Sequence, residues 1–213
     1  MNPCLLCLSP RTQPLLQRKK PPHYHLCLTC DLRFLQSDQR LDAPTEEARY
    51  REHNNQIEDP AYRGFLNPLR LEMLKRIQPK SRGLDFGAGP GPALAEMLKE
   101  DGHSMKVYDP IFWPDKDALT EKYDFVVTTE VVEHLFAPAQ EFGRLASLLK
   151  PDGWLGVMTL LYRPDIDFAE WYYPRDPTHV VFYSTQTFHW IARQYGFTEP
   201  VFVGDRLIIL QKN

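Results

Sequence analysis

A glycine-rich stretch, "GLDFGAGPGP" at residues 83–92, constrains the fold of this 213-residue chain more than any other segment. It joins a short apolar run, "GLDFG", to an amphipathic run, "PALAEMLKEDG", that ends at Gly102. A glycine loop between a strand and a helix lets the backbone approach a ligand closely, because glycine has no Cβ and tolerates positive φ. We therefore expect a strand, a ligand-binding turn and a helix here.

The spacing of the glycines indicates the kind of ligand. Dinucleotide-binding loops have the pattern G-x-G-x-x-G, whereas this loop has Gly87, Gly89 and Gly91, and Pro92 stands where the third glycine is needed. No Gly-Lys-Ser or Gly-Lys-Thr follows, which excludes a P-loop. Asp85 precedes the loop, and a carboxylate there favours a cofactor that bears an ammonium and a sulfonium over an anionic one. This chemistry indicates S-adenosylmethionine.

Apolar runs and amphipathic runs alternate along the rest of the chain. The predicted strands are "SMKVYDP", "KYDFVVTTE" and "GWLGVMTLL"; the predicted helices are "PAQEFGRLASLLK", begun by Pro138, and "STQTFHWIARQYGF", capped by Ser184. A turn at Gly204-Asp205 closes a final hairpin, "VFVGDRLIILQK". Alternation of this kind requires crossover connections, so we predict an α/β fold with a Rossmann-like, mostly parallel sheet and a terminal antiparallel hairpin.

Four motifs in this order resemble the class I S-adenosylmethionine-dependent methyltransferases: "LDFGAGPG", Asp109 at the end of the second strand, "YDFVVTTEVVEHL" and "LLKPDGWLGV". The resemblance covers residues 83–213, and "EVVEHL" with "DPTHVVFYSTQTF" is similar to the ubiquinone-biosynthesis type of small-molecule methyltransferase. It implies a methyltransferase whose cofactor contacts residues of three loops. By resemblance these are Asp85, Gly87, Gly89 and Gly91 at the methionine end, Asp109 on both ribose hydroxyls, and Thr129 and Glu130 at the end of the central strand.

One departure from the family concerns the third strand. Only "PIFWPDKDALTEKY" separates Asp109 from the "YDFVV" strand, so we expect the third strand to be vestigial or absent. The adenine contacts are then open: Phe112 or Trp113 packs on the ring, with Ala118 or Leu119 closing it, or the two aromatics only seal the sheet edge.

All four cysteines lie within the first 30 residues, as Cys4, Cys7, Cys27 and Cys30. Their spacing, C-x2-C-x19-C-x2-C, is typical of a zinc ribbon, in which two knuckles close a tetrahedral thiolate shell around a structural Zn²⁺. Disulfides are the alternative, and the expected reducing cytoplasm disfavours them. His23 and His25 flank the second knuckle and are expected at the surface. We predict a zinc ribbon over residues 1–40, a helical connector over 41–80 and the methyltransferase domain over 81–213.

The connector is predicted to contain two helices that cover one edge of the catalytic cleft. Thr45 is the expected N-cap of the first helix, and Pro60 opens the second. The second helix has one buried apolar face, formed by Tyr62, Leu66, Leu69, Met73 and Ile77 with Phe65 beside them. Four polar side chains are expected to be solvated or capping groups: Tyr50, His53, Asn54 and Tyr62.

Charge is distributed unevenly along the chain. Residues 1–40 carry six basic and two acidic side chains, a balance of +4, so the remainder carries −7 of the total −3. The basic residues are Arg11, Arg18, Lys19, Lys20, Arg33 and Arg40. A small basic module can dock on phosphate, whereas the acidic body opposes long nucleic acids. The longest apolar stretch, residues 154–162, is too short for a membrane span, and the N-terminus lacks a basic leader, so we expect a cytoplasmic protein.

Two histidines are candidates for catalysis, His134 after the central strand and His179 in "DPTHVVFYS". Each can act as a general base toward a hydroxyl, phenol or amine, or serve as a structural histidine. The segment "FAEWYYPRDPTH" is either a lid over a planar substrate or a packed surface segment. We expect a small-molecule acceptor. The alternatives are RNA or protein docked by the basic ribbon, or a non-catalytic zinc-dependent interaction protein.

Overall fold

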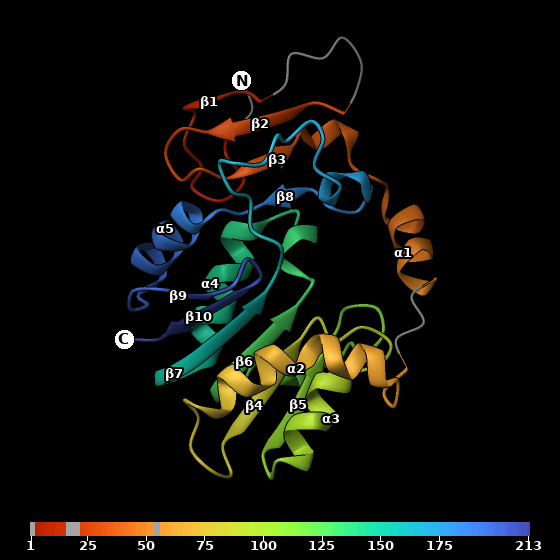
Figure 1. Ribbon diagram of the computed structural model, residues 1–213, viewed down its shortest axis with the longest axis vertical. Coiled ribbons are helices and arrows are strands. Elements are labelled where there is room, and N and C mark those ends of the chain that lie inside the picture. Colours follow the sequence, from red (N-terminus) through yellow and green to blue (C-terminus); the bar gives the residue numbers. More distant parts are fainter. Residues whose placement is uncertain (1–2, 16–21, 53–55) are drawn as a thin grey trace.

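The computed structural model describes residues 3–15, 22–52 and 56–213 (Figure 1). Arg18, Lys19 and Lys20 of the basic segment, and His53 and Asn54 of the connector, lie outside the described residues. The described chain forms two sheets, a six-stranded sheet in the order β5-β4-β6-β7-β10-β9 and a four-stranded sheet in the order β1-β2-β3-β8. No helix among the described residues is both long enough and apolar enough to cross a membrane.

The six-stranded sheet is mostly parallel. Its strands are β4 (Arg82–Phe86), β5 (Ser104–Tyr108), β6 (Tyr123–Thr129), β7 (Leu149–Met158), β9 (Val201–Val203) and β10 (Leu207–Gln211). The pairs among β5, β4, β6 and β7 are parallel, and β10 pairs antiparallel with both β7 and β9. The predicted Rossmann-like sheet with a closing hairpin is thereby confirmed. Between β5 and β6 the chain forms only the 3-10 helix η2 (Lys116–Leu119), so the third strand is absent, as the short connection predicted.

Helices cover both faces of this sheet. The helices α2 (Pro60–Leu74) and α3 (Ala93–Glu100) pack together on one face, and α4 (Pro138–Leu148) and α5 (Thr185–Tyr195) cover the other (Figure 1). Successive side chains of a strand point to opposite faces, so β6 serves both cores: Phe125 and Val127 pack with α2 and α3, and Val126 with α4 and α5. The helices cover the two faces, and the loops that follow the parallel strands lie together at the carboxyl ends of these strands.

Local signals in the sequence place most helix ends. Ser184 forms a capping box with Thr187, and Gly196 ends α5 in the left-handed conformation. The predicted N-cap Thr45 is wrong: Asp42 caps α1 (Ala43–Arg51), and its carboxylate accepts a hydrogen bond of 2.9 Å from the Thr45 backbone N–H. On α2 the positions Leu66, Leu69 and Met73 are buried as expected, whereas Phe65 is 39% exposed because it lies beside this stripe.

The four-stranded sheet joins the N-terminal segment to the body. Its strands are β1 (Thr12–Pro14), β2 (Tyr24–Cys27), β3 (Arg33–Leu35) and β8 (Val181–Phe182), and the 3-10 helix η1 (Ser37–Gln39) follows β3 in the sequence. Only β8 comes from the second half of the chain, and it pairs antiparallel with β3. Tyr24 packs edge-on against Phe168 and Phe182, with ring centroids 5.1 and 5.8 Å apart. The cysteine-bearing segment and the body therefore share one hydrophobic core.

Candidate active site

The glycine loop after β4 meets the ends of β5 and β6. Gly87 and Gly89 have φ of 77° and 62°, values that favour glycine. The backbone N–H groups of Gly87 and Ala88 donate to the Tyr108 carbonyl at 2.7 and 3.2 Å. A Cβ on Gly87 would lie 2.4 Å from Val131 Cγ2, so the loop packs directly against the residues that follow β6. The carboxyl ends of three strands thus form one cradle, where ligands of open α/β sheets bind.

Asp85 is the buried carboxylate at the base of this cradle. Its side chain is 2% exposed, and its Oδ1 has no hydrogen-bond partner among the described residues. Burial raises the pKa of Asp85 to about 7, the backbone N–H of Ala95 opposes this increase, and the charge of Asp109 adds to it. Buried polar atoms are almost always paired, so this oxygen marks a position where a ligand donor fits.

Asp109 ties the glycine loop to the end of β5. Its Oδ1 accepts hydrogen bonds from the backbone N–H groups of Ile111 and Phe112 at 2.9 and 3.0 Å, and its Oδ2 accepts one from Gly89 at 3.0 Å. The Trp113 indole donates to the Gly89 carbonyl at 2.8 Å. A carboxylate has about four acceptor positions, so one remains beside the loop. Phe112 and Trp113 also line an adjacent hollow of about 350 Å³.

Two glutamates lie just beyond the cradle, after β6. Glu130 is held at a positive φ of 51°, and Glu133 in the 3-10 helix η3 (Val132–His134) is completely buried. The Tyr173 hydroxyl donates to Glu133 and lies 3.3 Å from Glu130 Oε2, and the Thr159 hydroxyl donates to Glu133 at 3.0 Å. Arg206 pairs with Glu130 at 3.3 Å. Burial, together with repulsion between the two carboxylates, raises the pKa of this glutamate pair.

The structure brings the two predicted histidines together. Their rings are 4.7 Å apart between centroids, and the ring of Tyr50 packs edge-on against His134 at 5.4 Å. His134 Nδ1 lies 3.0 Å from the Thr178 carbonyl oxygen, and His179 Nδ1 lies 2.8 Å from that of Tyr173. A carbonyl oxygen only accepts, so each Nδ1 carries a proton and donates it to that carbonyl, which fixes the orientation of the ring.

Several residues of this cluster were missed by the sequence analysis: Glu133, Thr159 and Arg206, together with Tyr50, which was expected to be a solvated or capping group. Glu133 had a signal, because "EVVEHL" places it beside His134 and three residues after Glu130. Tyr173 begins the 3-10 helix η4 (Tyr173–Arg175) in the aromatic segment, where it and Trp171 are buried. The aromatic side chains of the segment are therefore packed, except that of Tyr172, which is exposed and accepts a hydrogen bond from Arg206 at 2.8 Å.

The four cysteines converge in the N-terminal segment that carries β1, β2 and β3. Their sulfur atoms all lie within 4.8 Å of one another, with Cys4–Cys30 at 3.5 Å and Cys7–Cys27 at 3.4 Å. A disulfide requires about 2.05 Å. Tetrahedral coordination at a Zn–S distance of about 2.3 Å places sulfurs roughly 3.8 Å apart, close to these values. His23 and His25 are half-buried and are not part of the sulfur cluster, and the His25 ring stacks on Phe34.

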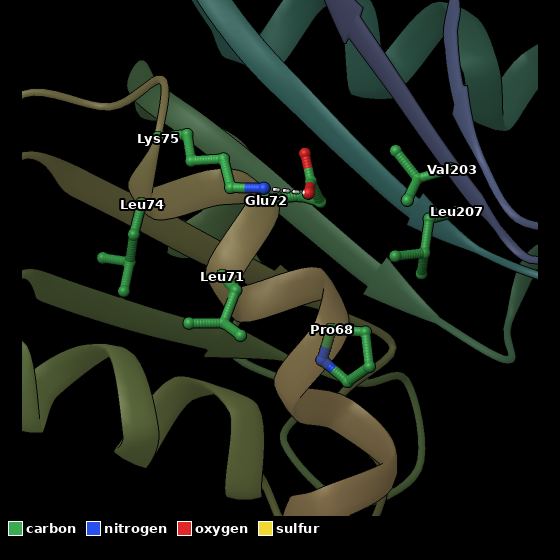
Figure 2. A pocket seen from close by; sticks show the side chains of 7 residues that line it. All are labelled: Pro68, Leu71, Glu72, Leu74, Lys75, Val203 and Leu207. Carbon is green, nitrogen blue, oxygen red and sulfur yellow. Dashed lines mark hydrogen bonds and ion pairs between the residues drawn. The ribbon is translucent and has the colours of Figure 1, made fainter.

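A larger hollow of about 510 Å³ lies elsewhere, between α2 and the β9–β10 hairpin (Figure 2). Apolar side chains dominate its lining, and its only charged groups are the paired Glu72 and Lys75. It contains none of the predicted site residues, and its two titratable groups pair with each other. The predicted cofactor-binding residues lie instead at the carboxyl ends of the parallel strands.

Comparisons with known proteins agree with this geometry. A family described as "Methyltransferase domain" matches residues 48–199. A ubiquinone biosynthesis O-methyltransferase of Hydrogenovibrio crunogenus is 30% identical over 45% of this chain and 50% of the relative, so the chain spans about half of that relative's length.

Solved methyltransferase structures share the fold. The 1,6-didemethyltoxoflavin-N1-methyltransferase of Burkholderia thailandensis, solved with 1,6-didemethyltoxoflavin and S-adenosylhomocysteine, has a TM-score of 0.55 at 16% identity, covering 87% of this chain and 97% of that one. Human N-acetylserotonin methyltransferase, solved with S-adenosylmethionine, has a TM-score of 0.56 at 14% identity, covering 81% of this chain and 57% of that one. The chain belongs to the methyltransferase domain family and has the fold of the class I S-adenosylmethionine-dependent methyltransferases.

Proposed function

We propose that this methyltransferase acts on a hydroxyl group of a small molecule. The observation that carries the proposal is the pair of imidazoles at the carboxyl ends of the strands, each oriented by its Nδ1, which donates to a backbone carbonyl. The partly matching relative that is named an O-methyltransferase, and the structural neighbour solved with a small acceptor, support the same class of reaction.

The cofactor is proposed to lie in the cradle formed by the glycine loop, Asp109 and the end of β6. S-adenosylmethionine supplies a methyl group on a sulfonium, which becomes a neutral thioether when the methyl group leaves. The unpaired oxygen of buried Asp85 fits the ammonium of the methionine end, and the remaining acceptor position of Asp109 fits a ribose hydroxyl. Gly87, Gly89 and Gly91 allow close approach, and Thr129 and Glu130 border the cofactor on the β6 side.

The acceptor is proposed to lie beside His134 and His179. In this account an imidazole Nε2 takes the hydroxyl proton as the oxygen gains the methyl group. Replacing either histidine by alanine is expected to lower kcat at least tenfold while leaving the dissociation constant of S-adenosylhomocysteine unchanged, because neither residue belongs to the cradle. His189→Ala is the matched control, since His189 lies on α5 and pairs with Glu199.

The acceptor class is tested by supplying radiolabelled S-adenosylmethionine with a pool of small phenols and alcohols, with total RNA and with total protein. Label transferred to the small-molecule fraction agrees with the proposal. Label in RNA, with a steep dependence on salt, would favour the alternative in which the basic N-terminal segment docks on phosphate.

We also propose that the four cysteines hold a structural Zn²⁺ in a ribbon over residues 1–40, joined by the connector 41–80 to the methyltransferase domain 81–213. The sulfur separations support this assignment. Metal analysis is expected to find one zinc ion per chain. A thiol-reactive mercurial should release this ion, and the Cys4→Ser variant should lack it. A chain purified without zinc, with full stability and four free thiols, would contradict it.

A further inference from the structure

The segment that carries His179 makes a tight turn whose first residue is Asp176. The sequence "DPTH" at residues 176–179 is typical of a turn, because proline fixes φ at about −65° and an aspartate side chain can bond the backbone two residues on. Both features are present. The His179 backbone N–H donates to the Asp176 carbonyl at 3.1 Å, and the Thr178 backbone N–H donates to Asp176 Oδ1 at 3.0 Å. The turn is therefore encoded by its own residues.

The Asp176 carboxylate also holds the side chain of Thr178. The Thr178 hydroxyl donates to Asp176 Oδ1 at 2.6 Å, and Thr178 is only 2% exposed. Burial opposes the ionisation of Asp176, but the hydrogen bonds from Thr178 lower its pKa below the ordinary value. The ionised carboxylate is a pure acceptor, so its Oδ1 holds both donors of Thr178 at once.

Both histidines are anchored to this turn. The Thr178 carbonyl accepts the Nδ1–H of His134 at 3.0 Å. His179 is the last residue of the turn, and its own Nδ1–H donates to the Tyr173 carbonyl at 2.8 Å. The two ring centroids lie 4.7 Å apart. A change in the turn therefore moves both the carbonyl that orients one ring and the backbone that carries the other.

The second carboxylate oxygen of Asp176 has a weaker contact, with the connector. Its Oδ2 lies 3.7 Å from Nη2 of Arg49 on α1, and the Arg49 side chain is 44% exposed. Arg49 also pairs with Glu52 at 2.8 Å. Exposed ion pairs contribute little to stability, so the main action of Asp176 comes from Oδ1 and the geometry of the turn rather than from its charge.

We propose that Asp176 is a positioning residue for the acceptor site, and that through its turn it places His134 and His179 relative to each other. The inference rests on the proposed function, in which both histidines lie beside the acceptor hydroxyl. Reaction rates are sensitive to misplacement of a catalytic group by about 1 Å, so loss of the turn should lower kcat. Asp176 acts through the histidines and not by contact with the acceptor or the cofactor.

Variants of the full chain separate the charge of Asp176 from the geometry of its turn. Asp176→Asn keeps an acceptor oxygen in the same place and loses the charge, whereas Asp176→Glu keeps the charge but moves the carboxylate one methylene further from the backbone. Asp176→Ala loses both. Asp167→Ala is the matched control: Asp167 accepts from the Ala169 backbone N–H at 2.9 Å in the same kind of turn, and neither histidine Nδ1 donates to that turn.

The readout is the position of the ring proton in each histidine, measured by long-range proton–nitrogen NMR correlation of protein labelled with nitrogen-15 in histidine. His134→Gln and His179→Gln assign the two rings among the seven histidines. The wild type, Asp176→Asn and Asp167→Ala are expected to carry the His134 proton on Nδ1, because the hydrogen bond to the Thr178 carbonyl sets the tautomer. In Asp176→Ala and Asp176→Glu the share of this form is expected to fall.

Two results would overturn the proposal. One is a His134 proton that stays on Nδ1 in Asp176→Ala and Asp176→Glu to the same extent as in the wild type. The other is loss of this form in Asp176→Asn but not in Asp176→Glu, which would assign the effect to charge. Binding of S-adenosylhomocysteine checks the folding of every variant, and if Asp176→Ala does not fold, the Asn and Glu variants decide.

Kinetics extend the test to the reaction. On an acceptor found by the labelling assay, Asp176→Glu is expected to lower kcat by at least about tenfold with an unchanged dissociation constant for S-adenosylhomocysteine, and Asp176→Asn is expected to stay close to the wild type. Equal kcat values in the wild type and Asp176→Glu would contradict the positioning role. Because the ring proton is read without turnover, failure to methylate any small hydroxyl compound would contradict the proposed function alone.

Discussion

Single residues set the shape of the cradle, and Gly87 is the most constrained of them. Its φ is 77°, and a Cβ would meet two Val131 methyl groups at 2.4 and 2.7 Å. Gly204 has a similar φ of 63°, but a Cβ there would meet nothing within 4 Å. Comparing alanine substitutions at the two glycines therefore separates the cost of backbone strain from the cost of steric overlap.

We expect Gly204→Ala to cost about 1–2 kcal/mol of unfolding free energy and Gly87→Ala about 2–5 kcal/mol, because overpacking adds about 1–3 kcal/mol to the backbone term. Urea denaturation measures both. The double variant Gly87→Ala/Val131→Ala should recover part of the loss, and equal costs for the two single variants would contradict the close packing of the two loops.

Asp85 makes the unliganded protein less stable as the pH rises. The pKa of its carboxyl is about 7 in the folded chain and about 3.8 when unfolded, so between these values the folded state keeps a proton that the unfolded state has lost. Stability then falls with pH across this window and stays low above it. We expect Asp85→Asn to be more stable than the wild type above pH 7, by up to about 4 kcal/mol, and equal to it below pH 4.

Thermal unfolding of both proteins across this pH range checks the expectation. The Asp85→Asn variant should also bind S-adenosylmethionine more weakly, because it lacks the carboxylate that we propose to face the ammonium. A stability difference that is the same at every pH would show that Asp85 does not titrate as described.

At the scale of elements, the sequence predicts well those features that depend on neighbouring residues. Strand and helix alternation, the capping Ser184 and the glycine loop all depend on neighbouring residues, and the structure contains each of them. β8 was not predicted, because two residues have no periodicity and its partner Phe34 is 147 positions before Val181. Glu133 was missed for a different reason: charged side chains are seldom fully buried, so a glutamate beside a histidine suggests a solvated position.

The pairing of β3 with β8 predicts that zinc and catalysis are coupled. β3 follows Cys30 by three residues, and β8 begins two residues after His179. Since a structural zinc site contributes folding free energy, its removal should release β3 and loosen His179. We expect zinc-free protein to lose at least tenfold in kcat, with a smaller change in cofactor affinity because the cradle belongs to β4, β5 and β6.

Adding back Zn²⁺ is the control and should restore the rate. Methyl transfer at the full rate by protein shown to contain no zinc would contradict the coupling.

At the scale of the whole molecule, the small sheet and the cradle are parts of one fold. The ribbon strands lie at one end of the molecule and the helices α2 and α3 at the other, with the carboxyl ends of the parallel strands between them (Figure 1). Backbone hydrogen bonds from Val180 to Glu133 and from Leu35 to Val180 connect the ribbon, the histidine segment and the end of β6. The proposed acceptor side is thus tied by backbone hydrogen bonds both to the N-terminal segment and to the end of β6.

The central claim is that S-adenosylmethionine binds in the cradle that the glycine loop forms with Asp109. Isothermal titration calorimetry tests it directly. The account predicts one binding site per chain in the wild type, at least tenfold weaker binding in Asp109→Ala, and unchanged binding in Asp165→Ala, where a 69% exposed carboxylate is removed. No binding by the wild type, or equal affinity in Asp109→Ala, would contradict it.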